Sequence, residues 1–141
     1  MLGRREPSIY GTESMEQIMV YLQRRYPDVR FTYLQSNHEG DLIDWVQKYA
    51  IPNAQCTMHN ELPCVGIVLN AGGYTHTSVA LHDAVVMAQV PIVEVHISDI
   101  RQREPFRQTS LLTDVCAHTI MGIGPRCYEE AVAWIVKEKE H

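Results

Sequence analysis

Glutamate and histidine lie two residues apart in the aliphatic stretch PIVEVHIS, residues 91–98, and a serine follows two residues later. Side chains two apart on a strand share a face, so Glu94, His96 and Ser98 would lie together. Burying a carboxylate or an imidazole is unfavourable unless the group is paired. A carboxylate that orients a histidine also raises its basicity, which suits proton transfer. A satisfied core histidine without a catalytic role is the alternative that these residues leave open.

A second polar cluster follows the aliphatic run VGIVLN, residues 65–70. Asn70 and His76 flank Gly72-Gly73, and the pair of glycines permits a backbone turn that other residues resist. These hydrogen-bonding groups could bind a polar ligand. The spacing fits neither a dinucleotide-binding loop nor a phosphate-binding P-loop, so an ordinary strand-to-helix turn stays an equal alternative.

Arginines form a local basic cluster in the segment RQREPFR, residues 101–107, within an acidic chain. Arg101, Arg103 and Arg107 stand around a turn in this segment. A charged loop is more often only solvated. Asp83, in the preceding predicted helix, has the spacing of a solvent-exposed helix residue.

The opening segment MLGRREPSIYG, residues 1–11, is polar and rich in arginine. A loop carrying Arg5 and Tyr10 could close over a bound anion, and we predict an active-site lid over residues 1–12. Tyrosine can act as a base when a neighbouring arginine lowers its pKa. A frayed terminus is the alternative.

Apolar runs and helical patterns alternate along the chain, which predicts an α/β fold with a parallel sheet and helices on both faces. We predict strands over residues 29–35, 65–70, 91–98 and 118–124, and helices over residues 14–26, 39–50, 77–88 and 128–140. In open parallel sheets, ligands bind beyond the carboxyl ends of the strands. The polar clusters that follow the predicted strands should therefore converge on one cleft.

Composition predicts a single domain over residues 1–141, since 45% of its residues are hydrophobic. The formal charge of −5 argues against binding to nucleic acid or anionic membranes. No stretch reaches the roughly 20 apolar residues of a membrane span, so we expect a cytoplasmic protein. The four cysteines show no zinc-site spacing, and we expect no metal.

Five sequence blocks, in this order and spacing, resemble type II 3-dehydroquinate dehydratase, or type II dehydroquinase: LGRREPSIYG, QSNHEGDLIDW, NAGGYTHTSVALHDA, VPIVEVHISDIRQREPFR and GIGPRCYEEAV. The resemblance implies a flavodoxin-like fold with a five-stranded parallel sheet in the order 2-1-3-4-5. It also implies a dodecamer built of trimers. The implied reaction is the anti elimination of water from 3-dehydroquinate through an enolate, in the shikimate or the quinate pathway, without metal or organic cofactor.

The resemblance carries roles onto individual positions. Tyr10 matches the family's base, Arg5 the arginine that favours its ionised form, His96 the general acid and Glu94 its orienting partner. The matching substrate-binding set is Asn70, His76, Asp83, Ile97, Ser98 and Arg107, with Asp83 expected to reach a site across a subunit boundary.

Three departures from the family pattern qualify these expectations. Ala71 replaces a frequent proline, and Asp99 replaces a frequent asparagine. The family's first strand and its Gly-Pro-Asn-Leu-Asn loop have no counterpart here, so we expect the natural product to start upstream of Met1. A non-catalytic subunit that binds dehydroquinate-type ligands is the main alternative function, and a flavin-binding module is a weaker one.

Overall fold

The computed structural model describes residues 14–51 and 62–140. Their three strands form one parallel sheet in the order β1-β2-β3. These strands are β1 (Ile67–Leu69), β2 (Ile92–His96) and β3 (His118–Met121). Each lies within a predicted strand, and the α/β class with parallel pairing is confirmed.

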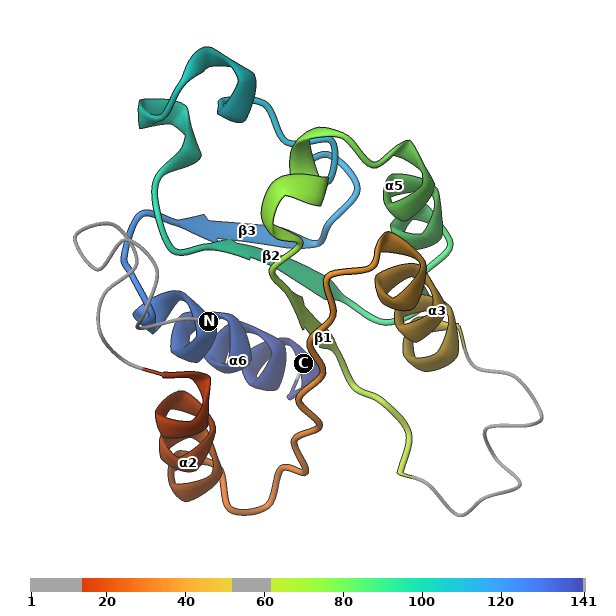
Figure 1. Ribbon diagram of the computed structural model, residues 1–141. Helices are drawn as coiled ribbons and strands as arrows, with labels where there is room; N and C mark the ends of the chain where they lie inside the picture. Colours follow the sequence, from red (N-terminus) through yellow and green to blue (C-terminus); the bar gives the residue numbers. More distant parts are fainter. Residues whose placement is uncertain (1–13, 52–61, 141) are drawn as a thin grey trace.

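The α-helices lie on both sides of the sheet (Figure 1). They are α2 (Met15–Arg25), α3 (Glu39–Ala50), α5 (Val79–Val86) and α6 (Arg126–Lys139), close to the predicted ranges. Ser14 starts α2 with a reciprocal capping box to Gln17, and the Ser78 side chain caps α5. Among the described residues, no helix is both long and apolar enough to cross a bilayer.

Two apolar clusters sandwich the central strand. On one face, Val93, Val95 and Ile97 pack against α6. On the other, helices α3 and α5 pack together in a cluster that includes Leu69 and Leu112. Helix α2 packs against α6 in a third cluster, which also includes Val68 of β1. Each face of the short sheet is therefore covered by α-helices.

The predicted strand over residues 29–35 is wrong, because this segment is not part of the sheet. A strand requires backbone hydrogen bonds to a neighbour. Strand β1 pairs with β2 alone among the described strands, and an open groove lies between its other edge and residues 29–35. No strand of the described residues lies in that groove.

Short 3-10 helices carry the chain past the carboxyl ends of the strands. They are η1 (Gly72–His76), η2 (Ile100–Gln102) and η3 (Pro105–Arg107). Gly72 starts η1 with φ of 56°, a left-handed conformation that glycine adopts without strain. The sharp turn brings the polar residues after β1 next to those that follow β2.

Candidate active site

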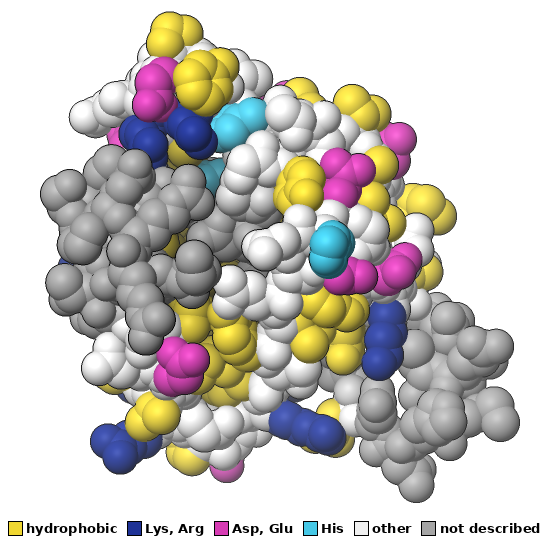
Figure 2. Space-filling model, viewed as in Figure 1, with side chains coloured by type: hydrophobic (Ala, Val, Ile, Leu, Met, Phe, Trp, Pro, Cys, Tyr) yellow, Lys and Arg dark blue, Asp and Glu magenta, His cyan; other side chains and the backbone are white. Residues whose placement is uncertain are grey.

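One groove gathers most of the predicted site residues. It has a volume of about 1460 Å³ and extends from the open edge of β1 to the carboxyl ends of β1 and β2. Its polar end is lined by Asn70, His76, His96, Ile97, Ser98, Arg103, Arg107 and Tyr128. On the face shown in Figure 2, basic and histidine side chains lie close together near the η2–η3 segment.

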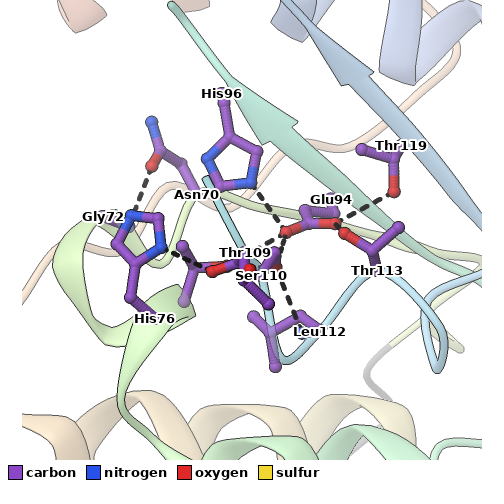
Figure 3. A network of polar contacts seen from close by, with 11 residues as sticks. Asn70, Gly72, His76, Glu94, His96, Thr109, Ser110, Leu112, Thr113 and Thr119 are labelled. Carbon is purple, nitrogen blue, oxygen red and sulfur yellow. Dashed lines mark hydrogen bonds and ion pairs between the residues drawn. The ribbon is translucent and has the colours of Figure 1, made fainter. Parts of the chain in front are cut away.

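His96 ends β2 and is held by Glu94 from the same face of the strand. Its Nε2 atom lies 2.7 Å from Glu94 Oε2, and the two side chains are 6% and 1% exposed. An ionised carboxylate can only accept, so Nε2 carries the hydrogen of this bond. The second ring nitrogen, Nδ1, points away from the carboxylate toward Asn70 (Figure 3). His96 can therefore exchange a proton with a ligand through Nδ1.

The Glu94 carboxylate accepts hydrogen bonds from four hydroxyl groups as well as from His96 (Figure 3). Its Oε2 atom is bonded by Thr75 at 3.0 Å and by Ser110, and its Oε1 atom by Thr113 at 2.7 Å and Thr119 at 2.9 Å. Burial alone would raise the pKa of Glu94, but these bonds, led by that from His96, lower it to about 2. Glu94 is therefore a fixed anion beside the histidine.

His76 and Asn70 are oriented by hydrogen bonds to neighbouring residues. His76 Nδ1 lies 2.8 Å from the carbonyl oxygen of Thr109, so Nδ1 carries the hydrogen and Nε2 stays available as an acceptor. Asn70 accepts from the Gly72 amide through Oδ1 at 3.1 Å and donates through Nδ2 to the Tyr128 hydroxyl at 2.8 Å. Burial raises the pKa of Tyr128 to about 12, which keeps its hydroxyl neutral.

Two guanidinium groups make the polar end of the groove attractive to an anion. Arg103 donates to Ser98 Oγ at 3.2 Å. Arg103 Nε lies 3.7 Å and Arg107 Nε 3.1 Å from one carboxylate oxygen of Glu104. Both guanidinium groups line the polar end of the groove, where their charge can attract an anion. This arrangement suits a small carboxylate-bearing molecule.

The structure does not bring every predicted residue to this groove. Asp83 lies on α5 with a side chain 70% exposed, and its carboxylate bonds His82 Nδ1 at 2.9 Å. Within one chain it is separate from the groove lining. Tyr10 and Arg5, with the predicted lid over residues 1–12, lie outside the described residues.

Sequence reasoning missed the hydroxyl groups around Glu94 and the tyrosine behind Asn70. Thr75, Ser110, Thr113 and Thr119 come from three segments separated along the chain. Thr75, Ser110 and Thr113 follow predicted strands, whereas Thr119 lies at the start of one, so the four share no single sequence signal. Tyr128 lies in the first turn of α6, the helix that follows β3.

Fold and site together define a small parallel α/β protein with a carboxylate-oriented histidine and an arginine-lined groove beyond its strand ends. Residues 1–136 match the family model of class II dehydroquinase. The chain belongs to the class II dehydroquinase family.

Named relatives agree with this assignment. The chain is 43% identical over 138 residues to the 3-dehydroquinate dehydratase of an Exiguobacterium species, covering 97% of this chain and 87% of the relative. It is 42% identical to that of Roseiflexus castenholzii, with coverages of 96% and 81%. The type II dehydroquinase structure from Butyrivibrio crossotus superposes with a TM-score of 0.81 at 34% identity, over 96% of this chain and 88% of that one. The structure from Propionibacterium acnes gives a TM-score of 0.79 at 31% identity, with the same coverages.

Proposed function

We propose that this chain is a 3-dehydroquinate dehydratase, a lyase that removes water from 3-dehydroquinate to give 3-dehydroshikimate. The observation that carries the proposal is the Glu94–His96 pair, which opens into a groove whose polar end carries Arg103 and Arg107. A histidine with one nitrogen fixed on a carboxylate supplies a general acid, and the arginines supply the charge that a substrate carboxylate requires.

The proposed reaction begins with loss of a proton alpha to the ketone. Tyr10, as phenolate favoured by Arg5, takes this proton, and the electron pair forms an enolate. Collapse of the enolate breaks the carbon–oxygen bond of the leaving hydroxyl. His96 then donates a proton from Nδ1, so that the hydroxyl departs as water, while Glu94 holds Nε2–H and stabilises the imidazolium form before transfer.

We further propose that the groove residues bind the substrate carboxylate and ring hydroxyls. This set is Asn70, His76, Asp83, Ile97, Ser98 and Arg107. The free Nε2 of His76 and the remaining amide hydrogen of Asn70 suit hydroxyl groups, and Arg107 suits the carboxylate. Asp83 would act in a neighbouring subunit's groove, since it is separate from the groove of its own chain.

The test is the rise in ultraviolet absorbance of the conjugated enone after 3-dehydroquinate is added to the purified chain. Turnover is expected, with Tyr10→Phe removing it while calorimetric binding of a substrate analogue persists. Tyr21→Phe is the matched control, because Tyr21 lies on the surface of α2 and bonds Glu129 at 3.0 Å. Analogue binding by the wild-type chain without any turnover would contradict the proposal and favour a non-catalytic binding subunit.

The finer features of the family resemblance are proposals for this chain as well. We propose one domain over residues 1–141 with residues 1–12 as a lid, a dodecamer built of trimers, and a cytoplasmic location in the shikimate or the quinate pathway. Light scattering of the purified protein tests the assembly, and fractionation of the source cells tests the location. A monomer in solution would remove the route by which Asp83 reaches a site.

A further inference from the structure

Two threonines bind the oxygen of Glu94 that His96 does not use. Thr113 Oγ1 and Thr119 Oγ1 lie 2.7 Å and 2.9 Å from Glu94 Oε1. Thr119 belongs to β3, and Thr113 to the loop before it. Both hydroxyls must donate, because an ionised carboxylate has only acceptor sites. The carboxylate is thus held at both oxygens by three separate parts of the chain (Figure 3).

We propose that Thr113 and Thr119 are positioning residues for proton transfer, acting on His96 through Glu94. By bonding Oε1, they fix the plane of the carboxylate and leave Oε2 directed at His96 Nε2. This contact assigns Nε2–H as the neutral tautomer and Nδ1 as the nitrogen that reacts. The effect on turnover rests on the proposed function, whereas the assigned tautomer does not.

The surroundings of Glu94 supply no competing charge. Burial, together with the charge of Glu94, raises the pKa of the Cys116 thiol to about 12, so this neighbour stays neutral. The hydroxyls of Thr75 and Ser110, which bond Oε2, carry no charge either. Among the residues that the structure places around this carboxylate, His96 and Glu94 are therefore the pair whose protonation Thr113 and Thr119 influence.

The experiment compares Thr113→Val, Thr119→Val and the double variant with Thr113→Ser and Thr119→Ser. Valine keeps the shape of threonine and removes the hydroxyl, whereas serine keeps the hydroxyl. Nitrogen-15 NMR of the histidine rings reports which nitrogen of His96 carries the hydrogen, with the signal assigned by its loss in His96→Asn. Steady-state kinetics from pH 5 to pH 9 gives kcat and KM for each variant.

Each valine variant should lower kcat about tenfold with KM unchanged. The free energy of a hydrogen bond to a charged group corresponds to about a tenfold change in rate. The double variant should show a mixture of His96 tautomers and an altered pH profile of kcat, and the serine variants should restore the wild-type values. A folded double variant with wild-type nitrogen shifts and pH profile would overturn the inference. If Thr119→Val does not fold, Thr113→Val gives the same test from an exposed loop position. A wild-type chain without turnover would refute the proposed function, and the nitrogen shifts would still decide this inference.

Discussion

The two faces of β2 are equally buried but have different roles: one packs in the core, and the other belongs to the candidate site. Val93 and Val95 are fully buried against α6, and Glu94, on the other face, is 1% exposed. The apolar face contributes burial free energy through its contacts with α6. The polar face has every hydrogen-bonding group of its carboxylate matched, and it presents His96 to the groove. Burial alone therefore does not distinguish a structural residue from a reactive one. The number of hydrogen-bond donors that converge on the residue does.

Replacing His96 should give the largest effect on rate. His96→Ala is expected to lower kcat by about 10²- to 10⁴-fold, the loss that follows removal of a general acid. The melting temperature should fall as well, because the buried Glu94 carboxylate loses the leading hydrogen bond among those that lower its pKa. Enone formation and a thermal melt measure the two quantities. An unchanged kcat would remove His96 from the mechanism.

Replacing Glu94 should affect both rate and stability, so the polar face of β2 has a structural role as well as a role in the reaction. Glu94→Gln keeps the shape but brings a donor NH₂ group among five donors, so at least one hydrogen bond is lost. We expect kcat to fall about 10²-fold, because His96 loses its fixed tautomer. A fall in stability with a wild-type kcat would make Glu94 purely structural.

Shortening a residue on the apolar face should affect stability alone. Val95→Ala removes two methyl groups from a site that is 0% exposed, and the free energy of unfolding should fall by about 2 kcal/mol. Urea denaturation measures this change. The folded fraction should keep kcat within about twofold of wild type, the margin expected without a direct contact. A much larger loss of kcat would mean that packing under α6 sets the position of His96.

Lowering the pH should reduce the stability that the polar face of β2 contributes, but not that of the apolar face. The folded pKa of Glu94, about 2, lies below its unfolded value of 4.5, so its ionised form stabilises the fold above pH 4.5. This contribution declines as the pH falls from 4.5 through 2. Wild type should therefore lose its advantage in melting temperature over Glu94→Gln across that interval. A constant difference between the two proteins would show that Glu94 does not stabilise the fold through its charge.

The smallest effect is expected at Asp99, just beyond the polar face. Its hydrogen bonds, chiefly with Arg101, lower its pKa to about 2, the same value as that of Glu94. The Arg101 side chain is 72% exposed, and solvent screens this pair. Asp99→Asn should leave kcat unchanged within about twofold and shift the melting temperature by about 2 °C or less. A large shift would show that a local surface pair can matter as much as the buried network.

Most of the fold could be predicted because aliphatic runs and helical periodicity are local signals. The strands at residues 67–69, 92–96 and 118–121 lie inside predicted runs. Residues 29–35 also carry β-branched and aromatic residues, which favour strands, and yet they are not a strand. Pairing depends on a neighbouring strand, which composition does not encode, so this error could not be avoided from the segment alone.

The candidate site was predictable where residues share one strand or one turn. The alternation of Glu94 and His96 with valines placed both on one face, as the structure confirms. The hydroxyls of Thr75, Ser110 and Thr119 could not be assigned to Glu94, because each contact joins residues at least 16 positions apart. Such contacts depend on tertiary structure. The position of Asp83 depends on a further subunit and stays a prediction.

The most direct test of the division between the two faces compares His96→Ala with Val95→Ala, neighbours on one strand, in a single enone-absorbance assay with 3-dehydroquinate. Rates are normalised to the folded fraction of each protein. We predict that Val95→Ala keeps the wild-type rate at a lower melting temperature, and that His96→Ala loses at least about 10²-fold in rate, far more than its lost stability explains. Rates that fall in both variants in proportion to lost stability would contradict the account, because β2 would then have one role rather than two.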